Sequence, residues 1–230
     1  MNDIDTQSAR PETNPSVAEN LLYLLLRHKN IIAGALVFVL ATGAAAFFWI
    51  QRQAALEKEA APLLSAAAAA YDRGDYQTAL DGTKESVGLK TISERYDGTP
   101  SGEMAELLLA NAYHATGMNE EALRAFSDVS LKSPDLQAAA LAGRASAESD
   151  LKKYRQAAAS FEAAAAKAGN TALKSQYLTA AAGNMLEAGE TEKAQKLFRE
   201  VVDRYPGSTG SGIAQRALWK ISGTLEAKEN

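Results

Sequence analysis

The sequence predicts an all-α protein in which one N-terminal transmembrane helix is followed by an α-solenoid of about four helical hairpins and a C-terminal capping helix. Three observations support this fold class. Alanine, the strongest helix former, accounts for 47 of the 230 residues, and only six residues are Pro. One stretch near the N-terminus is apolar over the thickness of a bilayer. After it, a helix–turn–helix pattern recurs four times.

The composition excludes several classes of function. With 24 Lys+Arg, 28 Asp+Glu and a net charge of −4, the chain lacks the basic excess that neutralises nucleic-acid phosphates. It has no Cys, so disulfides, thiolate metal sites and cysteine nucleophiles are excluded. Its only two His, His28 and His114, argue against a multi-histidine metal site. We therefore expect no nucleic acid, no cofactor and no metal.

Residues 1–30 are expected to form a cytoplasmic tail and a juxtamembrane helix. Residues 1–16 are polar and contain Pro, which is typical of a flexible tail. Residues 17–26 become apolar after Asn20, and we interpret them as a short interfacial helix, with a dedicated partner-binding helix as the alternative.

Residues 31–50 predict the transmembrane helix. None of them is charged, and a helix of about 20 residues spans the ~30 Å hydrocarbon core of a bilayer. Phe47, Phe48 and Trp49 lie at the far end, where aromatic rings favour the interface. Because the stretch exceeds the usual apolar core of a signal peptide, we favour an uncleaved anchor, and cleavage is the alternative.

The charges beside this helix predict its orientation. Arg27, His28 and Lys29 lie immediately before it, and cytoplasmic flanks are enriched in such cations. We therefore expect a single-pass membrane protein with a cytoplasmic N-terminus, which in a bacterium is a protein of the inner membrane. Residues 51–230 then form a solenoid domain in the periplasm.

Four similar segments follow, GDYQTAL (74–80), GMNEEAL (117–123), KKYRQAA (152–158) and GETEKAQ (189–195). In each, a short polar turn precedes a helix that buries an Ala. These alanines are Ala79, Ala122, Ala157 and Ala194, at intervals of 43, 35 and 37 residues. An Ala-rich helix precedes each turn, over residues 63–72, 103–116, 138–150 and 175–188. Four residues after the Ala, three repeats carry Phe126, Phe161 and Phe198, and two of these carry Pro134 and Pro206 eight residues later.

This pattern resembles the tetratricopeptide repeat (TPR), a helix–turn–helix unit with small residues at fixed places. The resemblance implies that helices A and B of each unit cross closely at the Ala. It also implies that the Phe fills the gap toward the next unit, that the Pro stops helix B, and that the units stack into a right-handed superhelix. Thr83 replaces the Phe in the first unit, and Lys152 replaces the Gly in the third. A different class of helical-hairpin solenoid is the alternative.

Two turns, residues 96–100 and 205–209, resemble each other, and each is expected to end a helix B and open a helix A. After the second turn, Ile213, Ala217 and Ile221 share one face of residues 212–222, which predicts an amphipathic capping helix. Trp219 is expected to pack against the fourth unit.

In TPR arrays the A helices line a concave surface, so the resemblance implies a protein-binding groove there. The transferred groove positions are Leu64, Ala68, Tyr71, Met104, Leu107, Asn111, His114, Ala142, Ser146, Ser149, Thr179, Gly183 and Leu186. This small, apolar and weakly polar lining suits an extended or helical polypeptide segment. Leu107 and Ala115 stand where one TPR subfamily needs Lys to grip C-terminal carboxylates, so that mode of binding is not expected.

No motif for catalysis or phosphate binding is present. His114 could in principle pair with a carboxylate such as Glu106, but it is expected to be a groove or surface residue and not a catalytic base. We therefore expect no enzymatic activity and no small-molecule substrate.

The layout of a short tail, one membrane helix and a TPR solenoid resembles the family of ancillary subunits of the bacterial SecYEG translocon. That resemblance implies a scaffold that holds client polypeptides or periplasmic chaperones beside the translocon. The alternative is a structural adaptor of another envelope assembly, such as the division, Tol-Pal-like, cytochrome-maturation or outer-membrane assembly machinery.

Overall fold

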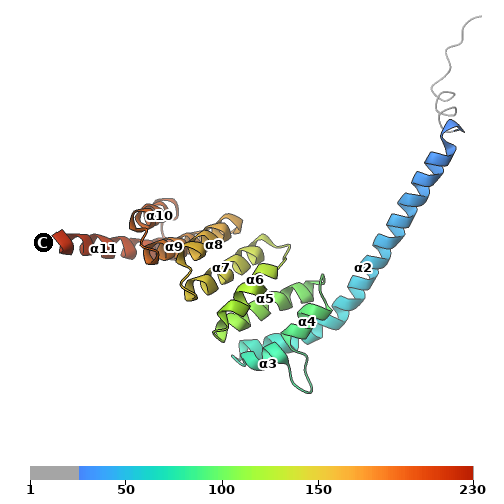
Figure 1. The fold of residues 1–230 in the computed structure, drawn as a ribbon, viewed down its shortest axis with the longest axis horizontal. Helices are drawn as coiled ribbons and strands as arrows, with labels where there is room; N and C mark the ends of the chain where they lie inside the picture. The colour runs from blue at the N-terminus through green and yellow to red at the C-terminus, as the bar shows by residue number, and fades with distance from the viewer. Residues whose placement is uncertain (1–25, 230) are drawn as a thin grey trace, which may run out of the picture. The chain divides into compact units, whose positions relative to one another are not determined.

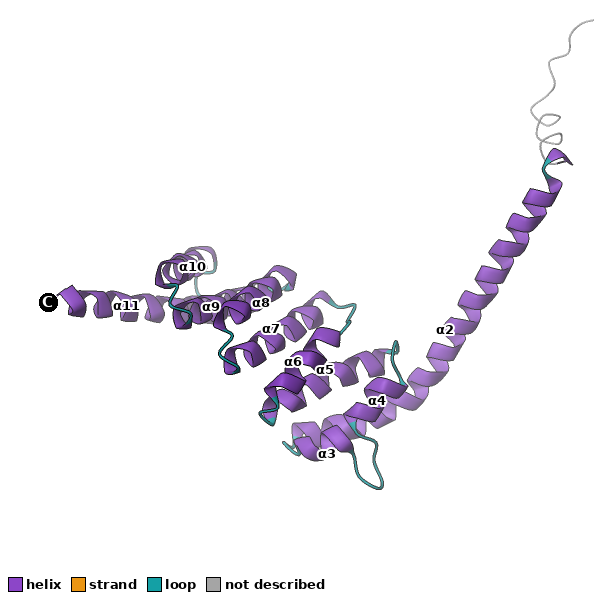
Figure 2. Cartoon of the chain, in the orientation of Figure 1, coloured by secondary structure: helices purple, strands orange, loops and turns teal. Residues whose placement is uncertain are grey.

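The computed structural model describes residues 26–229, with side chains as far as residue 223. The described residues form ten helices and no strand, which confirms the all-α prediction (Figure 1, Figure 2). The predicted flexible tail and nearly all of the predicted juxtamembrane helix lie outside the described residues.

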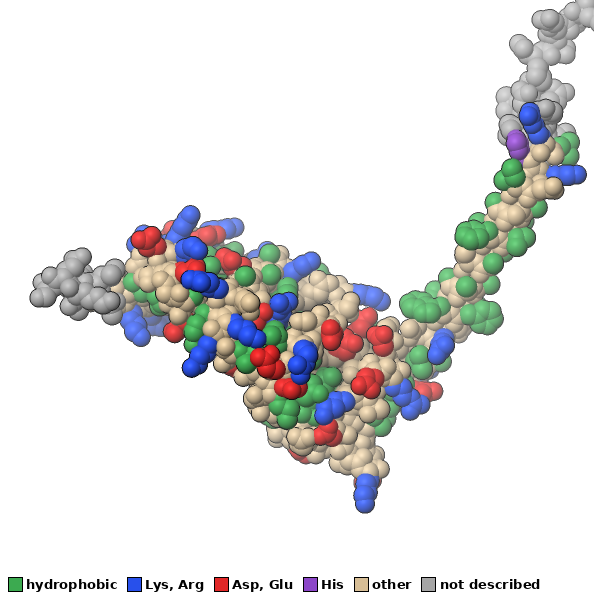
Figure 3. Space-filling model, in the orientation of Figure 1, with side chains coloured by type: hydrophobic (Ala, Val, Ile, Leu, Met, Phe, Trp, Pro, Cys, Tyr) green, Lys and Arg blue, Asp and Glu red, His purple; other side chains and the backbone are tan. Residues whose placement is uncertain are grey.

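The chain divides into two units, Met1–Arg52 and Gln53–Asn230. Helix α2 (Lys29–Asp72) is 44 residues long and contributes to both. Its first part contains a stretch with mean hydropathy 2.4 in which no residue is buried. Large side chains such as Ile31, Phe48 and Trp49 are 62–72% exposed, and hydrophobic side chains stand out along this helix in Figure 3. By length and composition this stretch can cross a membrane.

The one hydroxyl within that stretch is satisfied by the helix itself. The Thr42 side chain donates to the carbonyl oxygens of Phe38 at 2.9 Å and Val39 at 3.0 Å. A polar group inside a bilayer needs such a partner because the hydrocarbon offers none.

The second unit is a solenoid of helical hairpins in which each helix after α2 packs on the next helix in the chain, and the end of α2 shares a hydrophobic cluster with the three helices that follow it (Figure 1). The end of α2 pairs with two short helices, and three full hairpins and a final helix follow. The helices are α3 (Tyr76–Asp81), α4 (Leu89–Arg95), α5 (Pro100–Ala115), α6 (Asn119–Asp128), α7 (Pro134–Asp150), α8 (Tyr154–Lys167), α9 (Thr171–Glu187), α10 (Thr191–Arg204) and α11 (Thr209–Glu229). The A helices are therefore α2, α5, α7 and α9.

All four turns between helices A and B share one backbone geometry. Gly74, Gly117, Lys152 and Gly189 have φ of 78°, 75°, 59° and 79°. In each turn the N–H of this residue donates a hydrogen bond to the carbonyl three residues before it. The N–H of the following residue donates to the carbonyl five residues before that residue, as Lys153 N–H does to the Glu148 carbonyl at 2.8 Å. This is the Schellman ending of a helix, and it confirms the repeat register in all four units.

Lys152 holds this left-handed conformation without being glycine, at a cost of about 1–2 kcal/mol. We expect Lys152→Gly to stabilise the solenoid by roughly 0.5–1 kcal/mol, because the greater freedom of Gly in the unfolded chain offsets part of the relief. Thermal unfolding followed by circular dichroism measures this gain. The reverse exchange, Gly117→Lys, is the matched variant and should lower the melting temperature. A lower melting temperature for Lys152→Gly and a higher one for Gly117→Lys would contradict a common left-handed turn at the two positions.

The alanines after these turns are buried as predicted. Ala79, Ala122, Ala157 and Ala194 are all 0% exposed. The ring of Phe126 reaches the next unit, since a Cβ added to Gly143 on α7 would lie 2.3 Å from it. The Phe of this repeat therefore fills the space between neighbouring hairpins.

The first unit departs from the others because its helix B is interrupted. Residues 82–88 form a loop between α3 and α4, closed by an isolated bridge between Gly82 and Val87. The Thr83 hydroxyl accepts hydrogen bonds from the N–H groups of Glu85 and Ser86, each at 3.1 Å. Thr83 thus organises the inserted loop and takes no part in inter-unit packing of the kind that Phe provides.

The two similar turns do end one hairpin and open the next helix. Gly98 and Gly207 have φ of 75° and 76°. Thr99 accepts a hydrogen bond from Gly102 N–H at 3.0 Å, and Ser208 accepts one from Ser211 N–H at 3.1 Å. These side chains satisfy N–H groups that the first helical turn leaves without partners.

Two expectations were wrong. Pro134 does not stop a helix B, since α6 ends at Asp128; it is the first residue of α7, where its missing N–H costs nothing. Trp219 does not pack against the fourth unit and is 67% exposed. It stands two residues, or about 200° of helical rotation, from Ile221, which is buried.

Candidate functional site

The predicted groove residues occupy equivalent positions on the four A helices, but most of them contact other helices. Leu107 is 6% exposed and packs with Phe126 and Ala140, with Met104 at the edge of that cluster. Other members of the predicted set lie half-buried against the two remaining core clusters. These are Leu64, Tyr71, Ala142 and Leu186. The face that carries the predicted groove therefore serves largely as the seam between successive units.

The polar members of the set are also engaged within the fold. His114 Nε2 lies 2.9 Å from Asp150 Oδ2, so it links α5 to α7, and its carboxylate partner is Asp150 and not Glu106. The Ser146 hydroxyl donates to the Ala142 carbonyl at 3.0 Å. Asn111 and Ser149 are half-buried on the same seam.

At the fourth unit this face opens into a groove. It has a volume of about 520 Å³ and lies between α9, α10 and α11; we call it the A-face groove. Its lining residues are Thr179, Gly183, Leu186, Glu187, Thr191, Phe198, Ile213, Ala217, Lys220 and Ile221. The structure thus brings three predicted groove positions on α9 together with residues of α11. The sequence analysis had assigned α11 only to capping the solenoid.

Local geometry explains why this groove stays open. Thr179, 6% exposed, donates to the carbonyls of Ser175 at 2.7 Å and Gly210 at 3.1 Å, which ties α9 to the first turn of α11. A Cβ added to Gly183 would meet no atom within 4 Å, so this glycine leaves free space between the walls. Ile213 on α11 is 42% exposed. In the repeat pattern α11 takes the place of one further helix A, and this signal could have indicated that it lines the groove.

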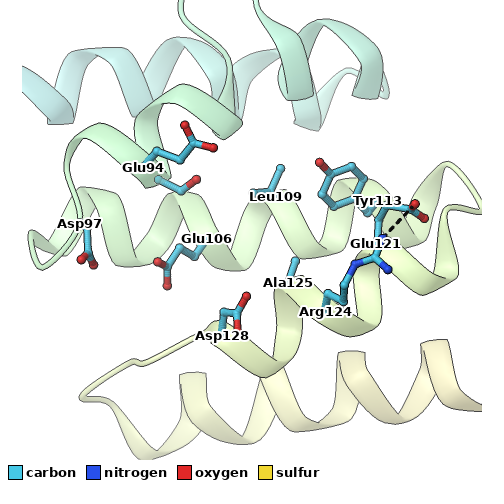
Figure 4. A pocket seen from close by; sticks show the side chains of 10 residues that line it. Glu94, Asp97, Glu106, Leu109, Tyr113, Glu121, Arg124, Ala125 and Asp128 are labelled. Atoms are coloured by element: carbon cyan, nitrogen blue, oxygen red, sulfur yellow. Dashed lines mark hydrogen bonds and ion pairs between the residues drawn. The ribbon is translucent and has the colours of Figure 1, made fainter.

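A second groove lies on the opposite face of α5, between α4, α5 and α6 (Figure 4). Its volume is about 600 Å³, and we call it the acidic groove. It is lined by Ser93, Glu94, Asp97, Glu106, Leu109, Tyr113, Glu121, Arg124, Ala125 and Asp128. Leu109 stands two residues after Leu107, and about 200° of helical rotation places it on the far side of α5 from the seam.

The acidic groove carries excess negative charge. Arg124, its one cation, pairs with Glu121 at 3.2 Å. Burial raises the pKa of the Glu106 carboxyl above its usual range, and the charges of Asp97 and Asp128 raise that pKa further. A smaller opposing effect comes from a backbone hydrogen bond of Ser130. Sequence reasoning missed this site because its carboxylates come from three helices and from the turn between α4 and α5.

No group of three or more His, Cys, Asp or Glu side chains within the described part of the chain could hold a metal ion together.

Comparison with known protein families finds a match to the tetratricopeptide repeat over residues 178–208. The matched segment includes most of α9, all of α10 and the following turn, and it contributes Thr179, Leu186 and Phe198 to the A-face groove. No curated protein matches the chain. Together with the helical hairpins, the match identifies the fold as a TPR-like solenoid.

Proposed function

We propose that this protein is a membrane-anchored scaffold that binds a polypeptide segment in the A-face groove. A TPR repeat supports a protein–protein interaction scaffold. The observation that carries the proposal is the open, largely apolar groove of about 520 Å³ between α9 and α11. Under this proposal the chain is not an enzyme and requires no cofactor, nucleic acid or small-molecule substrate.

The lining indicates the chemistry of the bound segment. Leu186, Ile213 and Ala217 offer apolar area, while Glu187 and Lys220 place opposite charges on two different helices of the groove. A helical or extended segment with an apolar side and polar flanks suits such a surface, because burial supplies affinity and the flanking charges set orientation.

The apolar part of α2 supports membrane attachment. In the proposed topology residues 1–30 are cytoplasmic, residues 31–50 span the inner membrane, and residues 51–230 form the periplasmic solenoid. Arg27 and Lys29 beside the apolar stretch favour this orientation. An anchor of this kind raises the local concentration of the solenoid near a membrane complex.

The finer proposal is that the complex is the Sec translocon. The solenoid then acts as an ancillary subunit that holds emerging clients or periplasmic chaperones beside SecYEG. The support for this proposal is the layout of tail, anchor and solenoid. The alternative is an adaptor of a different envelope assembly, and the two differ in the proteins that lie against the groove.

Site-specific photo-crosslinking in native membranes tests both levels of the proposal. A crosslinker at Ile213, which is 42% exposed in the groove, should capture translocon subunits, chaperones or secretory clients. The same crosslinker at Glu192, exposed on α10 outside the groove, is the control. Capture of division or outer-membrane factors would replace the translocon assignment. Equal capture from Ile213 and Glu192 would contradict the groove as the binding site. Digestion of the solenoid by protease in spheroplasts, but not in intact cells, checks its periplasmic side.

A variant that fills the groove gives a sharper result. Gly183→Leu projects a side chain into open space, so we expect crosslinking from Ile213 to fall at least about tenfold, equivalent to about 1.4 kcal/mol, while helicity is retained. Gly223→Leu is the matched control, because it also changes a helical glycine with nothing within 4 Å but lies outside the groove. Unchanged crosslinking in Gly183→Leu would place the binding surface elsewhere.

A further inference from the structure

The repeat architecture creates two equivalent grooves, each bounded by two successive B helices and the A helix between them. One is the acidic groove at α4, α5 and α6. The other, of about 410 Å³, lies at α8, α9 and α10 and is lined by Arg155, Ala158, Ala159, Glu162, Met185, Glu190 and Lys193. Both grooves arise from the same arrangement of helices, although the first is bounded by α4, which is part of the interrupted helix B of the first unit. Their charged side chains can therefore be compared.

The second of these grooves pairs its charges internally. Glu190 accepts from Arg155 Nε at 2.8 Å and from Lys193 Nζ at 2.9 Å. These two cations lower the pKa of the Glu190 carboxyl. Its four charged side chains, two of each sign, leave the groove electrically neutral.

The acidic groove differs in that its negative charge stays uncompensated. Among the ion pairs of the described residues, none involves Glu94, Asp97, Glu106 or Asp128. Figure 4 shows Asp97, Glu106 and Asp128 together toward one end of the groove and the Arg124–Glu121 pair toward the other. Lys90 lies 5.7 Å from the centre of the Tyr113 ring, but its ammonium pairs with Asp81.

The floor between these charges is apolar. Leu109, Tyr113 and Ala125 line it, from α5 and α6. Carboxylates around an apolar floor complement a segment that presents cations beside an aliphatic side chain. A neutral or acidic segment would leave the repulsion between Glu106 and its neighbours in place.

We propose that the acidic groove docks a Lys- or Arg-bearing amphipathic segment of a partner protein, with its cations on Asp97, Glu106 and Asp128 and an aliphatic side chain against Leu109 and Ala125. This surface lies on the opposite side of α5 from the seam. The scaffold then holds two different polypeptides, one in each groove. The inference is independent of the peptide bound in the A-face groove.

Binding of defined peptides to the full chain tests this. The chain is placed in nanodiscs of zwitterionic lipid, and fluorescence anisotropy follows a labelled amphipathic peptide of Lys and Leu. Binding should weaken as salt rises, because exposed charges are screened. A Glu and Leu peptide should not bind, and a Lys and Ser peptide should bind more weakly because it lacks the apolar contact.

Isosteric neutral variants locate the binding site. Glu106→Gln combined with Asp128→Asn should weaken the Lys and Leu peptide roughly five- to tenfold without lowering thermal stability, since it removes mutual repulsion. Glu162→Gln combined with Glu192→Gln removes the same charge on α8 and α10 and should leave binding unchanged. Equal weakening in both pairs, or tight binding of the Glu and Leu peptide, overturns the proposal. The chain could instead self-associate without binding the peptide, and lose this self-association in the Glu106→Gln and Asp128→Asn double variant. That result assigns the groove to a second copy of the chain and also overturns the proposal.

Discussion

Ala122→Trp should destabilise the solenoid by at least about 3 kcal/mol, which corresponds to a fall in melting temperature of roughly 6–12 °C. Ala122 is 0% exposed and packs with Leu107, Ala110 and Phe126 where α5 and α6 cross. An indole there must push the two helices apart. Thermal unfolding of the full chain, followed by circular dichroism, measures the effect.

Ala166→Trp is the control for this experiment. Ala166 is exposed on α8, so the same increase in side-chain size should change stability by no more than about 0.5 kcal/mol. An unchanged melting temperature for Ala122→Trp would contradict the assignment of Ala122 to the crossing of helices A and B.

The second large effect is expected at Gly102, in the first turn of α5. An added Cβ would lie 2.0 Å from the Tyr96 carbonyl oxygen and 2.6 Å from its carbon. Both are backbone atoms, so Gly102→Ala must displace the turn that joins α4 to α5. We expect a loss of about 2–3 kcal/mol in the free energy of unfolding, measured by chemical denaturation.

Gly212→Ala makes the same chemical change in the first turn of α11. There the nearest atom to an added Cβ is Arg216 Nη1 at 3.7 Å, the end of a flexible side chain. This control should stabilise the protein by about 0.5–1 kcal/mol through helix propensity. If both variants behave alike, the close approach of α5 to Tyr96 does not constrain the turn.

The turn at Gly102 also bears on the acidic groove. Thr99, which is 0% exposed, donates to the Tyr96 carbonyl at 2.7 Å and accepts from Gly102 N–H. These bonds hold Asp97, between the two helices, in place beside Glu106 on α5. Gly102→Ala should therefore weaken cationic peptide binding as well as stability, whereas Ala166→Trp should affect neither.

Local sequence determined the parts of this protein that depend on near neighbours in the chain. The left-handed turns, the buried alanines and the apolar helix were all predictable, because φ preference, helical period and hydropathy act over a few residues. Even Lys152, which departs from glycine, adopts the turn that the register predicted.

Only the tertiary structure decided which helical faces stay open. The resemblance to the TPR assigned Leu107, His114 and Leu186 to one groove, yet stacking buried the first, paired the second with Asp150 and left the third at an open groove. The acidic groove likewise exists because packing brings Asp97, Glu106 and Asp128 together from separate segments. The helical period determines the direction in which a side chain leaves the helix axis. The neighbouring helices determine whether that side chain contacts other side chains or solvent.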